Sequence, residues 1–182
     1  MRDEVFQWWA VPAIVVTEAV AAPACAVQYL SVAEAQQVLF PEADGFISSP
    51  VRLSNKQKEA VERYAGIRLR ADEQPVWRVE KDGVSVGWFL LDEVYGKHEF
   101  ITYAMGLDRD GTVRGLEILN YRESHGGEVR NENWRAQFDG KRYGDQLRLG
   151  KDVENISGAT LSCKHLTEGV RRLLAIYRAA LK

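Results

Sequence analysis

The residues best suited to chemistry lie in a short polar stretch near the C-terminal end, Glu154 to Ser162. It carries three hydroxyl side chains, Ser157, Thr160 and Ser162, with the small pair Gly158 and Ala159 between the first two. Small residues let the backbone approach a ligand closely, and free N–H groups at a helix start favour an anion such as phosphate. The stretch therefore predicts a phosphate-binding turn. The alternative that one hydroxyl simply caps a following helix stays open.

A long helix is expected to follow this stretch, from about Ser162 to Leu181. Its apolar residues recur at helical spacing and mark one face: Leu166, Val170, Leu173, Leu174, Tyr177 and Leu181. Arg171, Arg172 and Arg178 occupy other faces, and basic residues suit the last turns of a helix. The predicted phosphate turn is therefore placed at the N-terminal end of a buried helix.

Two shorter helices are predicted nearer the N-terminus. Each opens with a capping box, in which a serine is followed three positions later by Glu or Gln. The first begins after Ser31 and is stopped by Pro41, and the second begins after Ser54 and ends at Gly66. The residues between them, 40–54, are expected to form a loop.

The middle of the chain predicts strands. Two pairs of β-branched and aromatic runs flank Asp82-Gly83 and Asp110-Gly111, which are hairpin signals. The four runs are residues 76–80, 84–90, 100–105 and 113–119. Residues 120–156 are polar and loop-like around one short amphipathic piece, 133–138. We therefore expect an α+β fold, with a mostly antiparallel sheet of about four strands packed with helices, including the long C-terminal helix.

The N-terminus differs from the rest of the chain. Between Trp8 and Ala26 the only charge is Glu18, and Ala24-Cys25-Ala26 has the small-x-small pattern of a signal peptidase site. Residues 1–26 are therefore predicted to be a signal peptide, with a short buried or interfacial helix as the alternative. Residues 27–182 are predicted to form a single domain, with a helical N-terminal part (27–75) and a core (76–182). The sequence leaves open whether Cys25 is lipidated.

Composition argues against some functions. The chain has 24 basic and 26 acidic residues and a net charge of -2, so it lacks the basic surface that nucleic acid requires. Three histidines, at 98, 125 and 165, show no spacing that indicates a metal site. No catalytic triad is visible either, so we predict no metal ligands and no catalytic residues.

The run Ser157-Gly158-Ala159-Thr160, with Glu154 three residues before it, resembles the flavinylation motif of the FMN-binding domain family. That family includes the G subunit of the Rnf electron-transport complex and the C subunit of the sodium-pumping NADH:quinone reductase. In those proteins the last threonine of the motif is joined to FMN by a phosphoester bond, which a separate flavin transferase makes from FAD with a magnesium ion. The resemblance implies that Thr160 carries covalent FMN. It also implies that Glu154 replaces the usual aspartate and that Leu161 and Ser162 lie beside the cofactor.

A second stretch, Asn120 to Glu128, is similar to the family's glycine-containing loop, which lies against the flavin ring. This resemblance implies that His125, Gly126 and Gly127 contact the flavin. The likeness runs from about Phe100 to Leu181, and the chain looks like the stand-alone, soluble members of the family.

The resemblance implies an electron carrier rather than a stand-alone enzyme. FMN would supply the redox chemistry, and the protein would hold it in place. We expect a periplasmic or otherwise extracytoplasmic flavoprotein, membrane-associated in its function, that passes electrons from a membrane donor to an extracytoplasmic acceptor. Two alternatives are a flavin-dependent reductase with its own small substrate, and a non-redox binding module that has lost the flavin.

Overall fold

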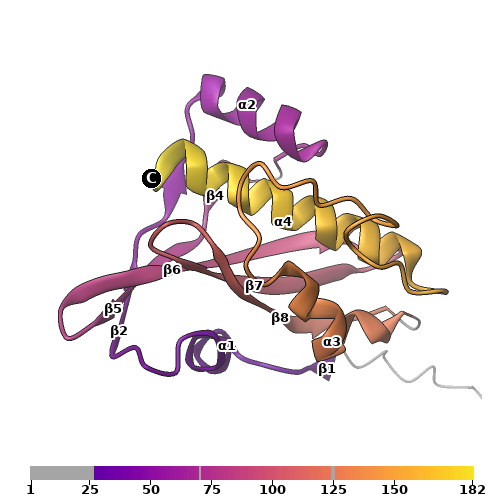
Figure 1. The fold of residues 1–182 in the computed structure, drawn as a ribbon, viewed down its shortest axis with the longest axis horizontal. Helices are drawn as coiled ribbons and strands as arrows, with labels where there is room; N and C mark the ends of the chain where they lie inside the picture. Colours follow the sequence, from indigo (N-terminus) through magenta and orange to yellow (C-terminus); the bar gives the residue numbers. More distant parts are fainter. Residues whose placement is uncertain (1–26, 70, 124–125) are drawn as a thin grey trace, which may run out of the picture.

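The structure is a computed structural model that describes residues 27–69, 71–123 and 126–182. Its centre is a six-stranded sheet in which every neighbouring pair of strands is antiparallel (Figure 1). In spatial order the strands are β1 (Val27–Gln28), β8 (Val113–Tyr121), β7 (Phe100–Asp108), β6 (Val84–Tyr95), β5 (Val76–Lys81) and β2 (Gly45–Ser48). Two further short strands, β3 (Val51–Arg52) and β4 (Glu73–Gln74), pair with each other. The predicted α+β class is confirmed.

Helices cover both faces of the sheet. The long helix α4 (Thr160–Ala180) runs along one face with α2 (Asn55–Ala65) on its outer side, and α1 (Val32–Leu39) lies on the opposite face (Figure 1). The short helix α3 (Glu132–Arg135) follows β8 and is flanked by two 3₁₀ turns, η1 (Gly127–Arg130) and η2 (Ala136–Phe138). The sheet is therefore the middle layer of the molecule.

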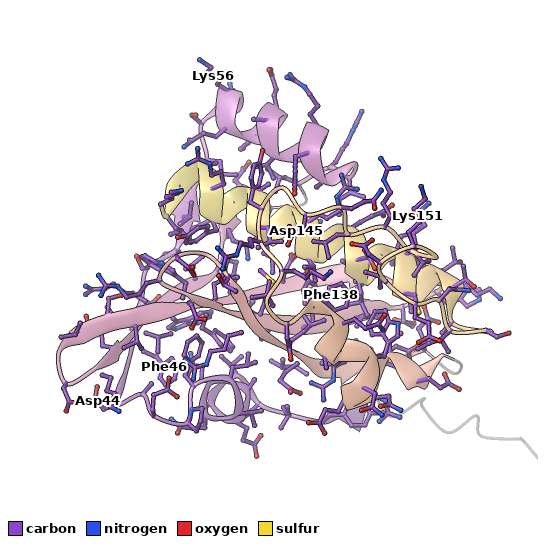
Figure 2. All side chains as sticks on the ribbon, in the orientation of Figure 1. Asp44, Phe46, Lys56, Phe138, Asp145 and Lys151 are labelled. Carbon is purple, nitrogen blue, oxygen red and sulfur yellow. The ribbon has the colours of Figure 1, made fainter. Side chains whose placement is uncertain are left out.

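The strands are apolar on both faces because each face supports its own core. Side chains alternate in direction along a strand, so Tyr103 and Met105 face α4 while Ala104 between them faces α1. On the α1 side, Phe46 of β2 lies between α1 and the sheet (Figure 2) and makes edge contacts with Phe40 and Phe89. The core on the α4 side is the larger one, and it contains the side chains that surround the predicted phosphate turn.

Both predicted capping boxes are present. The Ser31 and Ser54 hydroxyls accept the backbone N–H three residues later, and the side chains of Glu34 and Gln57 accept the serine N–H in return. Gly66 ends α2 in the left-handed region at φ 79°. Local sequence was sufficient here because the capping partners are only three residues apart.

Three expectations were wrong. Residues 40–54 are not a plain loop, because β2 pairs with the edge of β5 and β3 pairs with β4. The sheet has six strands rather than about four, since β1 and β2 also join it. These added strands have only two to four residues, too few to display an alternating pattern of their own. The long helix begins at Thr160, two residues before the expected start, so the threonine belongs to its first turn.

A buried polar cluster fixes α4 on the sheet. Nη2 and Nε of Arg172 donate to Asp92 Oδ2 of β6 at 2.5 and 3.1 Å, and the Tyr103 hydroxyl donates to the same oxygen at 2.6 Å. Arg172 is only 3% exposed, so its charge depends on this partner. Burial, reinforced by the nearby Asp92 carboxylate, raises the pKa of Tyr103, which keeps its hydroxyl protonated as a donor.

Gly169 allows the helix to approach this cluster. A Cβ at this position would lie 2.4 Å from the Tyr103 hydroxyl oxygen and 2.8 Å from Cγ1 of Val94. Both distances are shorter than any real contact, so a larger residue would push α4 away from β6 and β7.

We predict that Gly169→Ala lowers the free energy of unfolding by about 1–3 kcal/mol. In an exposed helix the same change raises stability by about 1 kcal/mol, so the sign distinguishes the two situations. Chemical denaturation measures the effect. In a Tyr103→Phe background the loss should shrink, because the nearest clashing atom is gone. A stabilised Gly169→Ala variant would contradict the close approach.

Candidate functional site

The turn before α4 leaves the helix start uncapped. Gly158 has φ 85°, in the left-handed region, and the N-cap residue Ala159 is buried and provides no side-chain capping bond. Ala159 N–H donates back to Ile156 at 3.0 Å, which closes the turn. No hydroxyl of the motif caps α4, so the capping interpretation of these residues is wrong. The N–H groups of the first helical turn have no partner within the helix and point toward an approaching anion.

Thr160 opens α4 with its side chain exposed. Its hydroxyl oxygen accepts a hydrogen bond from Nδ2 of Asn155 at 3.2 Å. This is the one side-chain hydrogen bond recorded for Thr160 among the described residues, and it leaves the hydroxyl accessible and able to donate. Ser162 differs, because it is 4% exposed and its hydroxyl lies 3.3 Å from that of Tyr121 inside the protein.

The amphipathic piece predicted at 133–138 anchors the motif from behind. Trp134 Nε1 donates to the carbonyl of Glu154 at 2.8 Å, and Glu154 N–H donates to Oε1 of Gln137 at 2.7 Å. Trp134 packs edge-to-face on Phe138, which lies in the interior of the molecule (Figure 2). Glu154 is thus held through its backbone, while its side chain is exposed and has no recorded bond within the described part of the chain.

The glycine-containing loop packs directly against the motif. Gly126 has φ 82°, and a Cβ there would lie 3.0 Å from Cβ of Ala159 and 2.9 Å from the Tyr121 hydroxyl. Burial raises the pKa of Tyr121, with the Ser162 hydrogen bond acting in the opposite direction. Gly127 opens the turn η1. His125 lies outside the described residues.

A cavity of about 630 Å³ opens between these parts. It is lined by the consecutive residues Ser157–Ser162, by Gly126, and by Lys97, His98, Glu123 and Glu128. Its volume falls in the range of ligand sites in proteins, about 300–1,000 Å³. Seven of the ten predicted site residues therefore line one cavity. Of the other three, Glu154 and Gly127 do not line it, and His125 is not described.

The sequence did not single out four of the lining residues: Lys97, His98, Glu123 and Glu128. Lys97 and His98 lie in the turn between β6 and β7. This turn is shorter than expected, because β6 extends to Tyr95, five residues beyond the expected end at 90. Their sequence distance from Thr160 gave no signal of proximity. Glu123 and Glu128 do belong to the stretch that resembles the flavin-facing loop, and that was the available signal.

Neighbouring groups on α4 have structural roles. Cys163 is fully buried, and burial raises the pKa of its thiol, so it stays protonated. Lys164 lies 4.0 Å from Glu168 on the next turn, and Nδ1 of His165 lies 2.5 Å from the carbonyl of Tyr95. Within the described ranges, no cluster of three His, Cys, Asp or Glu side chains is suited to a metal ion.

Residues 96–175 match the family described as FMN-binding domain. This segment is an FMN-binding domain. It contains the whole cavity lining, from Lys97 to Ser162, so the family expected from the motif is confirmed.

Curated relatives of this FMN-binding domain belong to redox complexes. The chain is 36% identical over 117 residues to the C subunit of a Na⁺-translocating NADH-quinone reductase from Yersinia pestis, covering 54% of this chain and 44% of that relative. It is 24% identical over 154 residues to the G subunit of a Na⁺-translocating ferredoxin:NAD⁺ oxidoreductase complex from Acetobacterium woodii, covering 79% and 72%. The chain therefore spans less than half the length of the quinone reductase relative that it matches.

The fold is also similar to that of a solved structure. The C subunit of a Na⁺-translocating NADH-quinone reductase from Parabacteroides distasonis superposes with a TM-score of 0.50 at 15% identity, over 82% of this chain and 83% of the other. Among the described residues, no helix is long and apolar enough to cross a bilayer.

The contact between the glycine loop and the motif can be tested with two matched glycines. Gly126 and Gly140 both have positive φ, but a Cβ at Gly140 would meet nothing within 4 Å. We predict that Gly126→Ala lowers the free energy of unfolding by about 1–2 kcal/mol more than Gly140→Ala, because only the first change places a Cβ against Ala159 and the Tyr121 hydroxyl. Urea denaturation of both variants measures the difference, and equal losses would contradict the packing.

Proposed function

We propose that this protein is an electron-transfer flavoprotein that carries FMN on Thr160 through a phosphoester bond. One observation carries the proposal: within an FMN-binding domain, an exposed threonine hydroxyl opens α4 at the edge of a cavity of about 630 Å³. FMN is the cofactor that this domain family binds. The covalent link and its site are the proposed part.

The residues present fit the two chemical halves of FMN. The uncapped start of α4 offers N–H groups and the positive end of the helix dipole to a phosphate. Gly158 and Ala159 have almost no side chain to obstruct it. The cavity beside them gives the ring system a place against Gly126. Bound FMN supplies the electron chemistry, and the protein holds it, orients it and limits the access of water.

Attachment requires Thr160 to act as a nucleophile toward FAD. Its oxygen bonds to the flavin phosphorus, the pyrophosphate bond breaks, AMP leaves, and the hydroxyl proton passes to a base of the flavin transferase or to solvent. The Asn155 contact orients the oxygen without removing its proton. The exposed carboxylate of Glu154 is the group that we assign to recognition by the transferase and its magnesium ion.

The remaining elements of the proposal concern the cellular setting. The relatives named above belong to Na⁺-translocating complexes, and translocation takes place at a membrane. We therefore place this carrier between a membrane redox donor and an extracytoplasmic acceptor. Residues 1–26 would act as a signal peptide, and the covalent link would keep FMN from diffusing away outside the cytoplasm. Residues 27–182 would then form the mature domain.

We predict that Thr160→Ala abolishes covalent flavin while leaving the fold intact, because the exposed side chain contributes little to packing. The chain is coexpressed with a flavin transferase and run on a denaturing gel under ultraviolet light, and its intact mass is measured. Ser162→Ala is the matched control, since it removes a buried hydroxyl that faces Tyr121, and it should keep the fluorescent band. A colourless wild-type chain of unmodified mass would refute the proposal.

A second change separates recognition from attachment. Glu154→Ala should slow flavinylation and leave the free energy of unfolding within about 0.5 kcal/mol of wild type, because only the exposed side chain is lost. The time course of flavin incorporation with purified transferase, FAD and magnesium measures the effect. Glu132→Ala removes a different exposed glutamate and should leave the rate unchanged. Equal rates in wild type and Glu154→Ala would exclude a role for this carboxylate.

A further inference from the structure

The turn between β6 and β7 is anchored by a single side-chain oxygen. Oε1 of Glu123 accepts the backbone N–H groups of three consecutive residues, Lys97, His98 at 2.6 Å and Glu99 at 3.0 Å. Hydrogen bonds to a charged acceptor are stronger than neutral ones. Desolvation alone would raise the pKa of Glu123, but these three donors outweigh it and the pKa lies below its usual value. The carboxylate is therefore ionised, and its Oε1 is engaged by three backbone amides.

The turn is shaped to receive this carboxylate. A Cβ on Gly96 would lie 2.4 Å from Oε1 of Glu123, so a larger residue would displace the carboxylate from its place in the turn. Within the turn, Gly96 N–H donates to the carbonyl of Glu99 at 2.8 Å, and the Tyr95 hydroxyl donates to the carbonyl of His98 at 2.7 Å. These internal hydrogen bonds stabilise the conformation of the turn, and the bonds to Glu123 connect the turn to the loop that follows β8.

The anchored turn is also a wall of the cavity beside Thr160. Lys97 and His98 line that cavity together with the start of α4. No ion pair of Lys97 is recorded in the part of the chain that the structure describes. Oε1 of Glu123, which accepts the Lys97 backbone N–H, is occupied by amides and bonds the backbone of Lys97 rather than its side chain. The Lys97 ammonium is therefore available to a negative charge inside the cavity.

We infer that Glu123 is a positioning residue: by holding the β6–β7 turn, it places Lys97 where its ammonium stabilises the negative charge of the bound flavin. Anchoring of the turn does not depend on the function proposed above, whereas the action of Lys97 on the flavin rests on it. The two parts are therefore measured separately.

The anchoring is tested on the flavin-free chain by amide hydrogen exchange. In Glu123→Ala, the amides of residues 97–99 should exchange at least about tenfold faster than in wild type, because three charge-assisted bonds are lost. Glu123→Gln, which keeps an acceptor but no charge, should give an intermediate increase. Amides in the middle of β7 report any global loss of stability and should change less. Unchanged exchange at 97–99 in Glu123→Ala would overturn the inference, whatever the state of flavinylation.

The action on the flavin is tested by spectroelectrochemical titration of the flavinylated chain. The electrode supplies two electrons and the buffer one proton, so the ring gains one negative charge on reduction. Removing the nearby cation should disfavour that charge, and Lys97→Gln should shift the reduction equilibrium roughly threefold to tenfold toward oxidised flavin, or about 15–30 mV. Glu123→Ala loosens the turn but also removes a negative charge from the cavity lining, and these two effects on the potential oppose each other. The effect of Lys97→Gln is therefore also measured in a Glu123→Ala background, where it should be smaller than in wild type because the turn no longer holds Lys97 in place.

The matched control is Glu99→Gln, which removes one negative charge from the same turn but neither lines the cavity nor contributes its side chain to the anchor. It should leave the amide exchange at 97–99 near wild type and should not lower the midpoint potential. If Glu123→Ala accelerates exchange while Lys97→Gln does not lower the potential, or lowers it equally in the wild-type and Glu123→Ala backgrounds, the turn is a structural feature only and the inference fails.

Discussion

The buried contact between Arg172 and Asp92 determines where the last helix lies, and the site depends on that position. A guanidinium that is 3% exposed must keep its carboxylate partner, so α4 cannot slide along the sheet without leaving a charge unpaired. Gly169 one turn earlier lets the backbone come close enough for the pair to form. The first residue of the same helix is Thr160, twelve positions before Arg172. The location of the Thr160 hydroxyl is thus set by an ion pair well inside the protein.

The site is assembled from three parts of the chain that approach one another because the strands between them are long. β6 and β7 carry the turn of Lys97 and His98 to the end of the sheet where α4 begins. β8 delivers Gly126 to the same end, where its missing side chain makes room for Ala159. Two of these approaches have a glycine at the point of contact, Gly96 against Glu123 and Gly126 against Ala159, and the missing side chains let the segments come close together.

The parts of the fold that sequence predicted are those with local signals. The capping boxes at Ser31 and Ser54 and the Asp-Gly hairpins need only neighbouring residues to be recognised. The motif around Thr160 was recognisable in the same way, although the helix begins earlier than its apolar periodicity suggested. The short strands β1 and β2 were missed because their stability comes from pairing with distant strands. The hydrogen bonds between Glu123 and the β6–β7 turn join residues about 25 positions apart, so no local sequence pattern could have predicted them.

The identity of the residue at the start of α4 has a mechanical consequence. Threonine is β-branched, so its side chain has few allowed χ1 rotations, and a helical backbone restricts them further. A group esterified there leaves the protein along one of a small number of directions. A serine in the same position has more allowed χ1 rotations, so the attached group could leave the protein in more directions. If FMN is esterified to Thr160 as proposed, the methyl group would limit the directions in which the phosphate leaves the protein, so the start of the tether would point toward the cavity in few alternative ways.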